Sequence, residues 1–202
     1  MVKTLDFIFD FASPNAYLVH QLMPGIAART GAVVRYVPCL LGGIFRATGN
    51  SAPMVKNAAI KGLREYDMLE MRRFIARHGI DKFVMNQHFP VNTLLVMRGA
   101  IVAEEDGDLA RYIEAVLHHM REAPKKLDDP DVAAAALTEA GFVGAGLLAR
   151  TQHEAVKAKL MANTEDAVAQ GAFGIPTFFV GTEMFYGKER LGQVEEMLAS
   201  AL

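Results

Sequence analysis

The first part of the chain shows strand spacing, then helical spacing, then strand spacing again. Residues 3–10 alternate between apolar and polar positions and are rich in Phe and Ile, which predicts a strand. From Pro14 the apolar positions recur at helical spacing toward Gly31, and residues 33–38 return to a strand pattern. Two strands joined by a helix of this length predict a right-handed parallel unit.

After residue 39 the pattern is helical for more than half of the chain. We predict helices over residues 56–78, 93–105, 109–121, 130–140 and 151–170. Strand signals return at residues 177–180 and 183–186, and a last helix begins at about residue 189. This order predicts an α/β protein in which residues 46–159 form an inserted all-helical domain, while residues 1–45 and 160–202 form the domain that contains the sheet.

Composition and charge indicate a soluble globular protein without a nucleic-acid partner. Hydrophobic residues make up 51% and charged residues 22% of the chain, and the net charge is -2 with no Lys/Arg-rich tract. No apolar stretch reaches the roughly 18 residues of a membrane span. The first residues lack the charged and apolar regions of a leader peptide. We therefore expect a cytoplasmic protein that does not bind a membrane.

Candidates for thiol chemistry and for a metal site are few. Cys39 is the only cysteine, which excludes intrachain disulfides and Cys-rich zinc sites. Apolar neighbours at the end of a predicted strand favour a structural role for this thiol. The adjacent His118 and His119 point in different directions on a helix, so they are poorly placed to share a metal. We predict no metal site.

Two short motifs carry the candidate chemistry. Ser13-Pro14-Asn15-Ala16 lies between the first predicted strand and helix, and on its own it reads as an ordinary N-cap followed by proline. Gly174-Ile175-Pro176-Thr177 precedes the third predicted strand, and a cis Ile175-Pro176 bond there would leave the backbone polar groups of Ile175 free to pair with an extended ligand.

Together these motifs resemble the DsbA-like branch of the thioredoxin superfamily. Within it they are most similar to the members without active-site cysteines, the kappa-class glutathione transferases and the 2-hydroxychromene-2-carboxylate isomerases. Further matching stretches lie at residues 9–17, 49–50, 61–63, 89–93, 97–100 and 185–191. The Phe89-Pro90-Val91-Asn92-Thr93 stretch, with Met-Arg-Gly at 97–99, is closer to the isomerases. The resemblance implies a thioredoxin-like fold with an inserted all-helical domain, and a homodimer.

The resemblance also implies a glutathione cofactor whose sulfur lies beside Ser13. The implied cofactor-binding residues are Asn50, Lys61, Ile175, Pro176, Gly187, Lys188 and Glu189. Lys56 is an alternative to Lys61, because the segment between Asn50 and Lys61 is about two residues longer than in the transferases. A small aromatic carboxylate would be the substrate, for which the candidate residues are Phe45, Arg46, Phe89 and Asn92.

The implied activity is glutathione-dependent isomerisation of 2-hydroxychromene-2-carboxylate to an o-hydroxybenzylidenepyruvate in aromatic-compound catabolism. Ser13 would donate a hydrogen bond to a sulfur anion and would not act as a nucleophile, since no His-Asp pair is placed to activate it. One alternative is a kappa-like glutathione transferase or peroxidase. Another is a non-catalytic thioredoxin-like protein that binds an extended peptide. Disulfide exchange at this junction is excluded, because residues 13 and 16 carry no sulfur.

Overall fold

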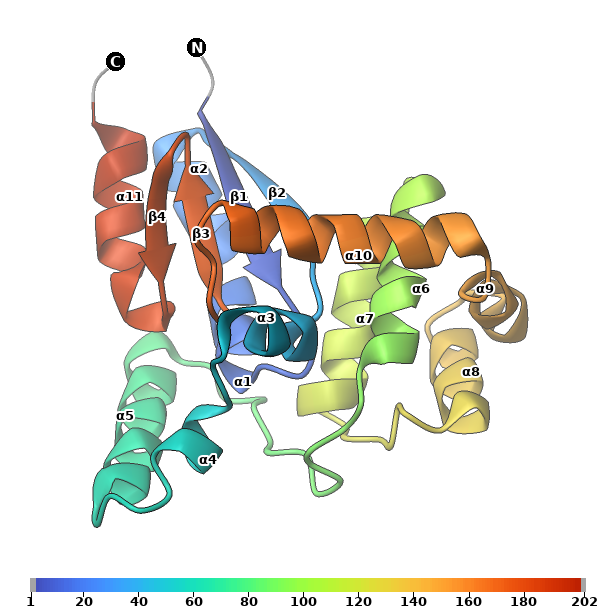
Figure 1. Ribbon diagram of the computed structural model, residues 1–202, viewed down its shortest axis with the longest axis horizontal. Coiled ribbons are helices and arrows are strands. Elements are labelled where there is room, and N and C mark those ends of the chain that lie inside the picture. Colours follow the sequence, from blue (N-terminus) through green and yellow to red (C-terminus); the bar gives the residue numbers. More distant parts are fainter. Residues whose placement is uncertain (1–2, 201–202) are drawn as a thin grey trace.

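The computed structural model describes residues 3–200 and contains a four-stranded mixed sheet (Figure 1). The strands are β1 Thr4–Phe9, β2 Val33–Pro38, β3 Thr177–Val180 and β4 Glu183–Tyr186. Their order is β2-β1-β3-β4, with β1 parallel to β2 and β3 antiparallel to both β1 and β4. All four predicted strands and the parallel unit are confirmed. The first two and last two residues of the predicted sheet domain lie outside the described residues.

The helices account for most of the remaining chain. They are α1 Pro14–His20, α2 Met23–Thr30, α3 Leu41–Thr48, α4 Pro53–Lys56, α5 Leu63–His78, α6 Leu94–Glu105, α7 Leu109–Arg121, α8 Pro130–Glu139, α9 Gly144–Arg150, α10 Glu154–Ala169, the 3-10 helix η1 Lys188–Arg190 and α11 Leu191–Ala199. The predicted domain boundaries, after residues 45 and 159, fall inside α3 and α10. Those boundaries stay a prediction.

Two predicted helices are each interrupted. The helix after β1 divides into α1 and α2, because Pro24 has no N–H and is tolerated only in the first turn, where it stands in α2. The helix expected over residues 56–78 begins only at Leu63, because α4 ends at Lys56 and Gly62, with a left-handed φ of 85°, precedes α5. The short α9 lies outside the predicted helices. Its Gly144 allows close approach to α8, since a Cβ there would lie 2.1 Å from the Ala134 carbonyl oxygen.

The alternating pattern of the strands separates the two faces of the sheet. Phe7 and Phe178 stack with ring centroids 5.3 Å apart, and both are buried. In Figure 1, α10 crosses in front of the sheet while α2 lies behind it, and both helices contact β2. The carboxyl end of β1 leads into α1 at the lower edge of the sheet, next to the start of β3. The two motifs found in the sequence therefore lie at one edge.

Candidate functional site

Ser13 joins the two sequence motifs. Its side-chain oxygen accepts a hydrogen bond from the Ala16 N–H at 3.2 Å, which caps α1. The hydroxyl also donates to the carbonyl oxygen of Ile175 at 3.3 Å, and Ser13 is only 5% exposed. The Ile175-Pro176 bond is cis, as predicted. The expectation that the Ile175 carbonyl is unpaired is wrong, because the Ser13 hydroxyl occupies it.

The turn after β4 lies against the same edge. The Gly187 N–H donates to the Pro176 carbonyl at 3.0 Å, and the η1 helix that follows contacts α1. Lys188 is 6% exposed, and its ammonium group pairs with the Glu189 carboxylate. The same ammonium lies 5.4 Å from the ring centroid of Phe74 on α5. The turn thus brings a buried cation and its partner anion to the edge that carries Ser13.

Asn50 is tied to the loop that precedes β3. Its amide donates to the Phe173 carbonyl at 2.7 Å, two residues before Ile175. Phe173 packs on Tyr186 with ring centroids 4.5 Å apart. Gly174 fits beneath the tyrosine, since a Cβ at this position would lie 2.8 Å from that ring. Asn50, the cis-proline loop and the β4 turn are therefore held together.

The two lysine candidates are placed differently. Lys56 ends α4 and Lys61 lies in the turn before α5, and both are exposed. Within residues 3–200, neither forms an ion pair. The structure leaves either ammonium available to a ligand.

The four candidate substrate residues lie on two segments, Phe45 and Arg46 on α3 and Phe89 and Asn92 in the loop before α6. Arg46 lines a groove of about 730 Å³ between α3 and α10, whose lining does not include Phe45, Phe89 or Asn92. Asn92 uses its side-chain oxygen to accept the Leu94 N–H at 3.0 Å, at the start of α6. Phe89 is half-buried and precedes a second cis proline.

A family comparison identifies the fold that carries this edge. The sequence profile of the DSBA-like thioredoxin domain matches residues 4–199. The chain belongs to this family. The thioredoxin-like fold predicted from the sequence is thereby confirmed.

Relatives of this DSBA-like domain include enzymes named as isomerases and transferases. A 2-hydroxychromene-2-carboxylate isomerase of Sphingobium xenophagum is 26% identical over 200 residues, covering 98% of this chain and 99% of the relative. The rat glutathione S-transferase kappa 1 is 26% identical, covering 99% of this chain and 91% of the relative. A solved 2-hydroxychromene-2-carboxylate isomerase superposes with a TM-score of 0.81 at 25% identity, covering 96% of this chain and 93% of that one.

Two buried residues of this DSBA-like domain escaped the sequence analysis. Asp10 is 1% exposed, and its carboxylate accepts hydrogen bonds from the Thr93 hydroxyl at 2.6 Å and from the backbone N–H groups of Ala12 and Leu41 at 2.8 Å. Burial raises the pKa of Asp10, and the three hydrogen bonds oppose that shift. The sequence signal for this buried acid is its position between two phenylalanines, Phe9 and Phe11.

Arg121, at the end of α7, is fully buried. Its guanidinium donates to the carbonyl oxygens of Phe11 at 3.2 Å and Ala12 at 2.8 Å, directly before Ser13. Burial lowers the pKa of Arg121 to about 10, and the Asp10 charge opposes this shift. A basic residue in the last turn of a helix is ordinary, so the pattern of α7 does not indicate that Arg121 is buried.

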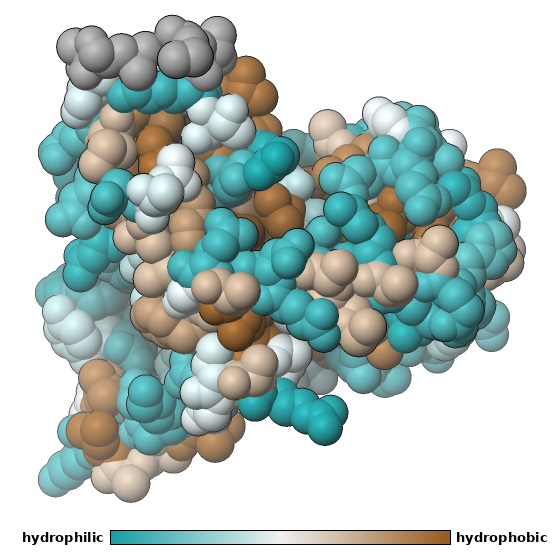
Figure 2. Space-filling view, turned by 45° about the horizontal axis from the view of Figure 1, so that its top comes forward, coloured by the Kyte–Doolittle hydropathy of each residue, from teal (hydrophilic) through white to brown (hydrophobic). Residues whose placement is uncertain are grey.

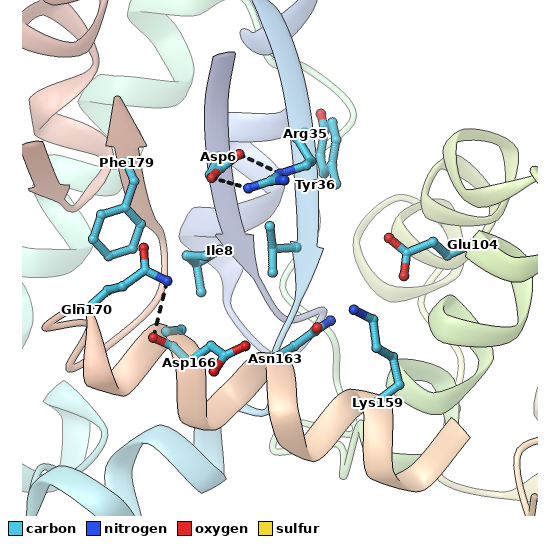
Figure 3. Close-up of a pocket in the computed structure, with 12 residues that line it drawn as sticks. Asp6, Ile8, Arg35, Tyr36, Glu104, Lys159, Asn163, Asp166, Gln170 and Phe179 are labelled. Atoms are coloured by element: carbon cyan, nitrogen blue, oxygen red, sulfur yellow. Dashed lines mark hydrogen bonds and ion pairs between the residues drawn. The ribbon is translucent and has the colours of Figure 1, made fainter. Parts of the chain in front are cut away.

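Other features of the DSBA-like domain lie away from this edge. A cavity of about 240 Å³ lies between the sheet and α10, and none of the predicted site residues lines it. Arg35 pairs with Asp6 at this cavity (Figure 3). Cys39 is fully buried, and burial raises the pKa of its thiol to about 12.

Residues 3–200 contain no grouping of His, Cys, Asp or Glu side chains suited to a metal ion. In the same range no helix has the length and hydropathy of a membrane span.

Proposed function

We propose that this protein is a cytoplasmic glutathione-dependent isomerase that interconverts 2-hydroxychromene-2-carboxylate and an o-hydroxybenzylidenepyruvate in aromatic-compound catabolism. The observation that carries the proposal is the contact of the Ser13 hydroxyl with the carbonyl of Ile175 beside a cis proline. This edge presents a hydroxyl donor without a protein thiol. Relatives named as this isomerase match 96% to 100% of the chain at 25% to 26% identity, which supports the choice of reaction.

The residues present fit glutathione. The γ-glutamyl end of glutathione carries an amino group and a carboxylate, and the turn beside α1 carries Glu189 and Lys188. Gly187, with a φ of 93°, keeps this turn free of a side chain next to the Glu189 carboxylate. The matching contacts would be made by Gly187, Lys188 and Glu189 to the γ-glutamyl end, by Ile175 and Pro176 to the cysteinyl part, and by Asn50 with Lys61 or Lys56 to the rest of the peptide.

Ser13 can hold the sulfur of this cofactor as an anion. A free thiol has a pKa of about 8.5, so about 3% is ionised at pH 7. Lowering that pKa by about two units takes about 2.7 kcal/mol, and a hydrogen bond to a charged group contributes about 1.5 to 3 kcal/mol. The 3.3 Å bond from Ser13 to Ile175 is longer than the usual O–H···O range, so redirecting the hydroxyl costs little.

When bound, glutathione would supply a thiolate that adds reversibly to the conjugated double bond of the substrate, permits rotation and then leaves. The chain's own part is to bind the peptide, to orient the Ser13 O–H toward the sulfur, and to place the substrate carboxylate near a cation. Arg46 is the candidate for that cation, and Phe45, Phe89 and Asn92 are the candidates for the rest of the substrate site. No cysteine of the protein is required, in keeping with the burial of Cys39.

A homodimer forms part of this proposal. Exposed apolar side chains gather on α4, the turn after it and the first half of α5, at the lower left of Figure 2. They are Met54, Val55, Ile60, Tyr66 and Met68. Apolar groups concentrated on one projecting segment support an interface with a second copy. Sedimentation of the purified protein measures the oligomeric state, and a monomer at micromolar concentration would remove the dimer from the proposal.

The experiment that tests the function compares three readouts on the purified protein. We expect isomerisation of the chromene carboxylate to require glutathione and to leave its concentration unchanged after many turnovers. A kappa-like transferase would instead consume glutathione with an electrophile such as chlorodinitrobenzene, and this is the second candidate function because of the kappa relatives. Binding of an extended peptide without either activity would overturn both enzyme proposals.

A further inference from the structure

The guanidinium of Arg121 is buried directly beneath the strand-to-helix junction. One of its nitrogens, Nη2, donates to the carbonyl oxygens of Phe11 and Ala12, whereas Nε and Nη1 have no hydrogen-bond partner in the described structure. No carboxylate of residues 3–200 lies within ion-pairing distance of it. A buried cation with so few partners costs stability, and an apolar side chain of similar size is often as stable or more so. Packing alone does not account for an arginine here.

The junction is held from the opposite side by Asp10. Its carboxylate accepts the Ala12 N–H, and its own backbone carbonyl accepts the Ser13 N–H at 3.1 Å. Thr93 on the segment before α6 fixes that carboxylate through a 2.6 Å hydrogen bond. The backbone of Ala12 is therefore held at both of its polar groups, the N–H by Asp10 and the carbonyl by Arg121.

We propose that Arg121 is a positioning residue for the reaction, which holds the Phe11-Ala12 turn so that the Ser13 hydroxyl is directed at the cis-proline loop. This inference rests on the proposed function. Both hydrogen bonds come from Nη2, at the far end of the guanidinium, and the ammonium of a lysine would end one bond short of that position. The site thus needs the reach of arginine as well as its charge.

The variants that test this inference are Arg121→Lys and Arg121→Met, with Arg150→Met as the matched control. Arg150 lies on α9 in surface ion pairs with Asp106 and Glu105. Misplacing the Ser13 donor should lower kcat by about 10- to 100-fold in both Arg121 variants. The KM for glutathione should change little, since Asn50, Lys188 and Glu189 are untouched. Arg150→Met should keep both constants.

A readout independent of activity separates this inference from the proposed function. Hydrogen exchange of a peptide spanning residues 9–17 should be faster in Arg121→Lys than in the unmodified protein, with no change in α9. If Arg121→Met does not fold, Arg121→Lys carries the test alone. Unchanged kcat and unchanged exchange in Arg121→Lys would overturn the inference. If the unmodified protein shows no glutathione-dependent activity, the proposed function fails, and unchanged exchange would then separately reject the positioning role.

Discussion

Replacing Ser13 separates its chemical role from its structural role. In the structure the side-chain oxygen accepts the Ala16 N–H at 3.2 Å, and the hydroxyl hydrogen is directed at the Ile175 carbonyl at 3.3 Å. Both Ser13→Ala and Ser13→Gly remove the donor that we assign to the sulfur anion. They differ in capping, because alanine at an N-cap costs about 0.5 to 2 kcal/mol of stability whereas glycine costs only a few tenths.

The expected loss of activity follows from the donor alone. A hydrogen bond to a charged group is worth about 1.5 to 3 kcal/mol, which corresponds to about 10- to 100-fold in kcat/KM. We expect both variants to lose activity to this extent at pH 7, while Ser13→Ala has the lower melting temperature. Part of the loss should be recovered above about pH 8.5, where the thiol ionises without the donor.

The assay is the initial rate of isomerisation at saturating glutathione, measured from pH 6 to pH 9.5 well below the melting temperature. Equal kcat/KM for the unmodified protein and Ser13→Gly would refute a donor role. A rate that follows the melting temperature, lower in Ser13→Ala than in Ser13→Gly, would show that the cap is what matters. Loss of the same size in both variants is the predicted result.

Other predictions concern stability and reactivity. Cys39 should react with thiol reagents only at the rate of unfolding, because its thiol is fully buried with a pKa of about 12; fast modification of the native protein would contradict this. Gly99→Ala should destabilise the protein by about 1 to 3 kcal/mol in denaturant unfolding, since the new Cβ would lie 2.1 Å from the tyrosine hydroxyl of α7. The control Gly42→Ala, whose Cβ would meet open space, should be neutral or stabilising. The hydrogen bond from His20 lowers the pKa of Glu114, so this carboxylate contributes stability above its ordinary pKa of about 4.3 and loses it as the pH falls through the lower folded value. Because the Glu114 side chain is 67% exposed, Glu114→Gln should cost less than about 1 kcal/mol at pH 7, and the difference from the unmodified protein should shrink as the pH falls below about 4.3.

Local sequence patterns were sufficient to predict the sheet and the edge at which the two motifs meet. Alternation in residues 3–10 and 33–38 was sufficient to predict β1 and β2, because side chains on a strand point to opposite faces in turn, and the more exposed face keeps polar residues. The junction at Ser13 and the cis bond before Pro176 followed from turn chemistry and from the family resemblance. Pro24 and Gly62 stand inside predicted helices, and both residue types interrupt helices. Their positions in the sequence mark where α2 and α5 begin.

Contacts between distant segments could not be predicted in the same way. Whether Arg46 faces α10 or the site depends on how α3 packs, which no local spacing encodes. Arg121 lies 109 residues from the Ala12 carbonyl that it binds, and its helix carries an ordinary amphipathic pattern. Buried polar contacts of this kind are set by the assembled core, so they emerge only from the structure.

The central claim is that Ser13 holds glutathione as a thiolate at the edge of the sheet. Difference ultraviolet absorption during a glutathione titration at pH 7 measures the ionisation of the bound thiol directly, with Ser13→Ala as the comparison and calorimetry to record occupancy. We predict saturable binding with a thiolate band in the unmodified protein, and binding with a much weaker band in Ser13→Ala. Glutathione bound as the neutral thiol, or the same thiolate band in both proteins, would contradict the account.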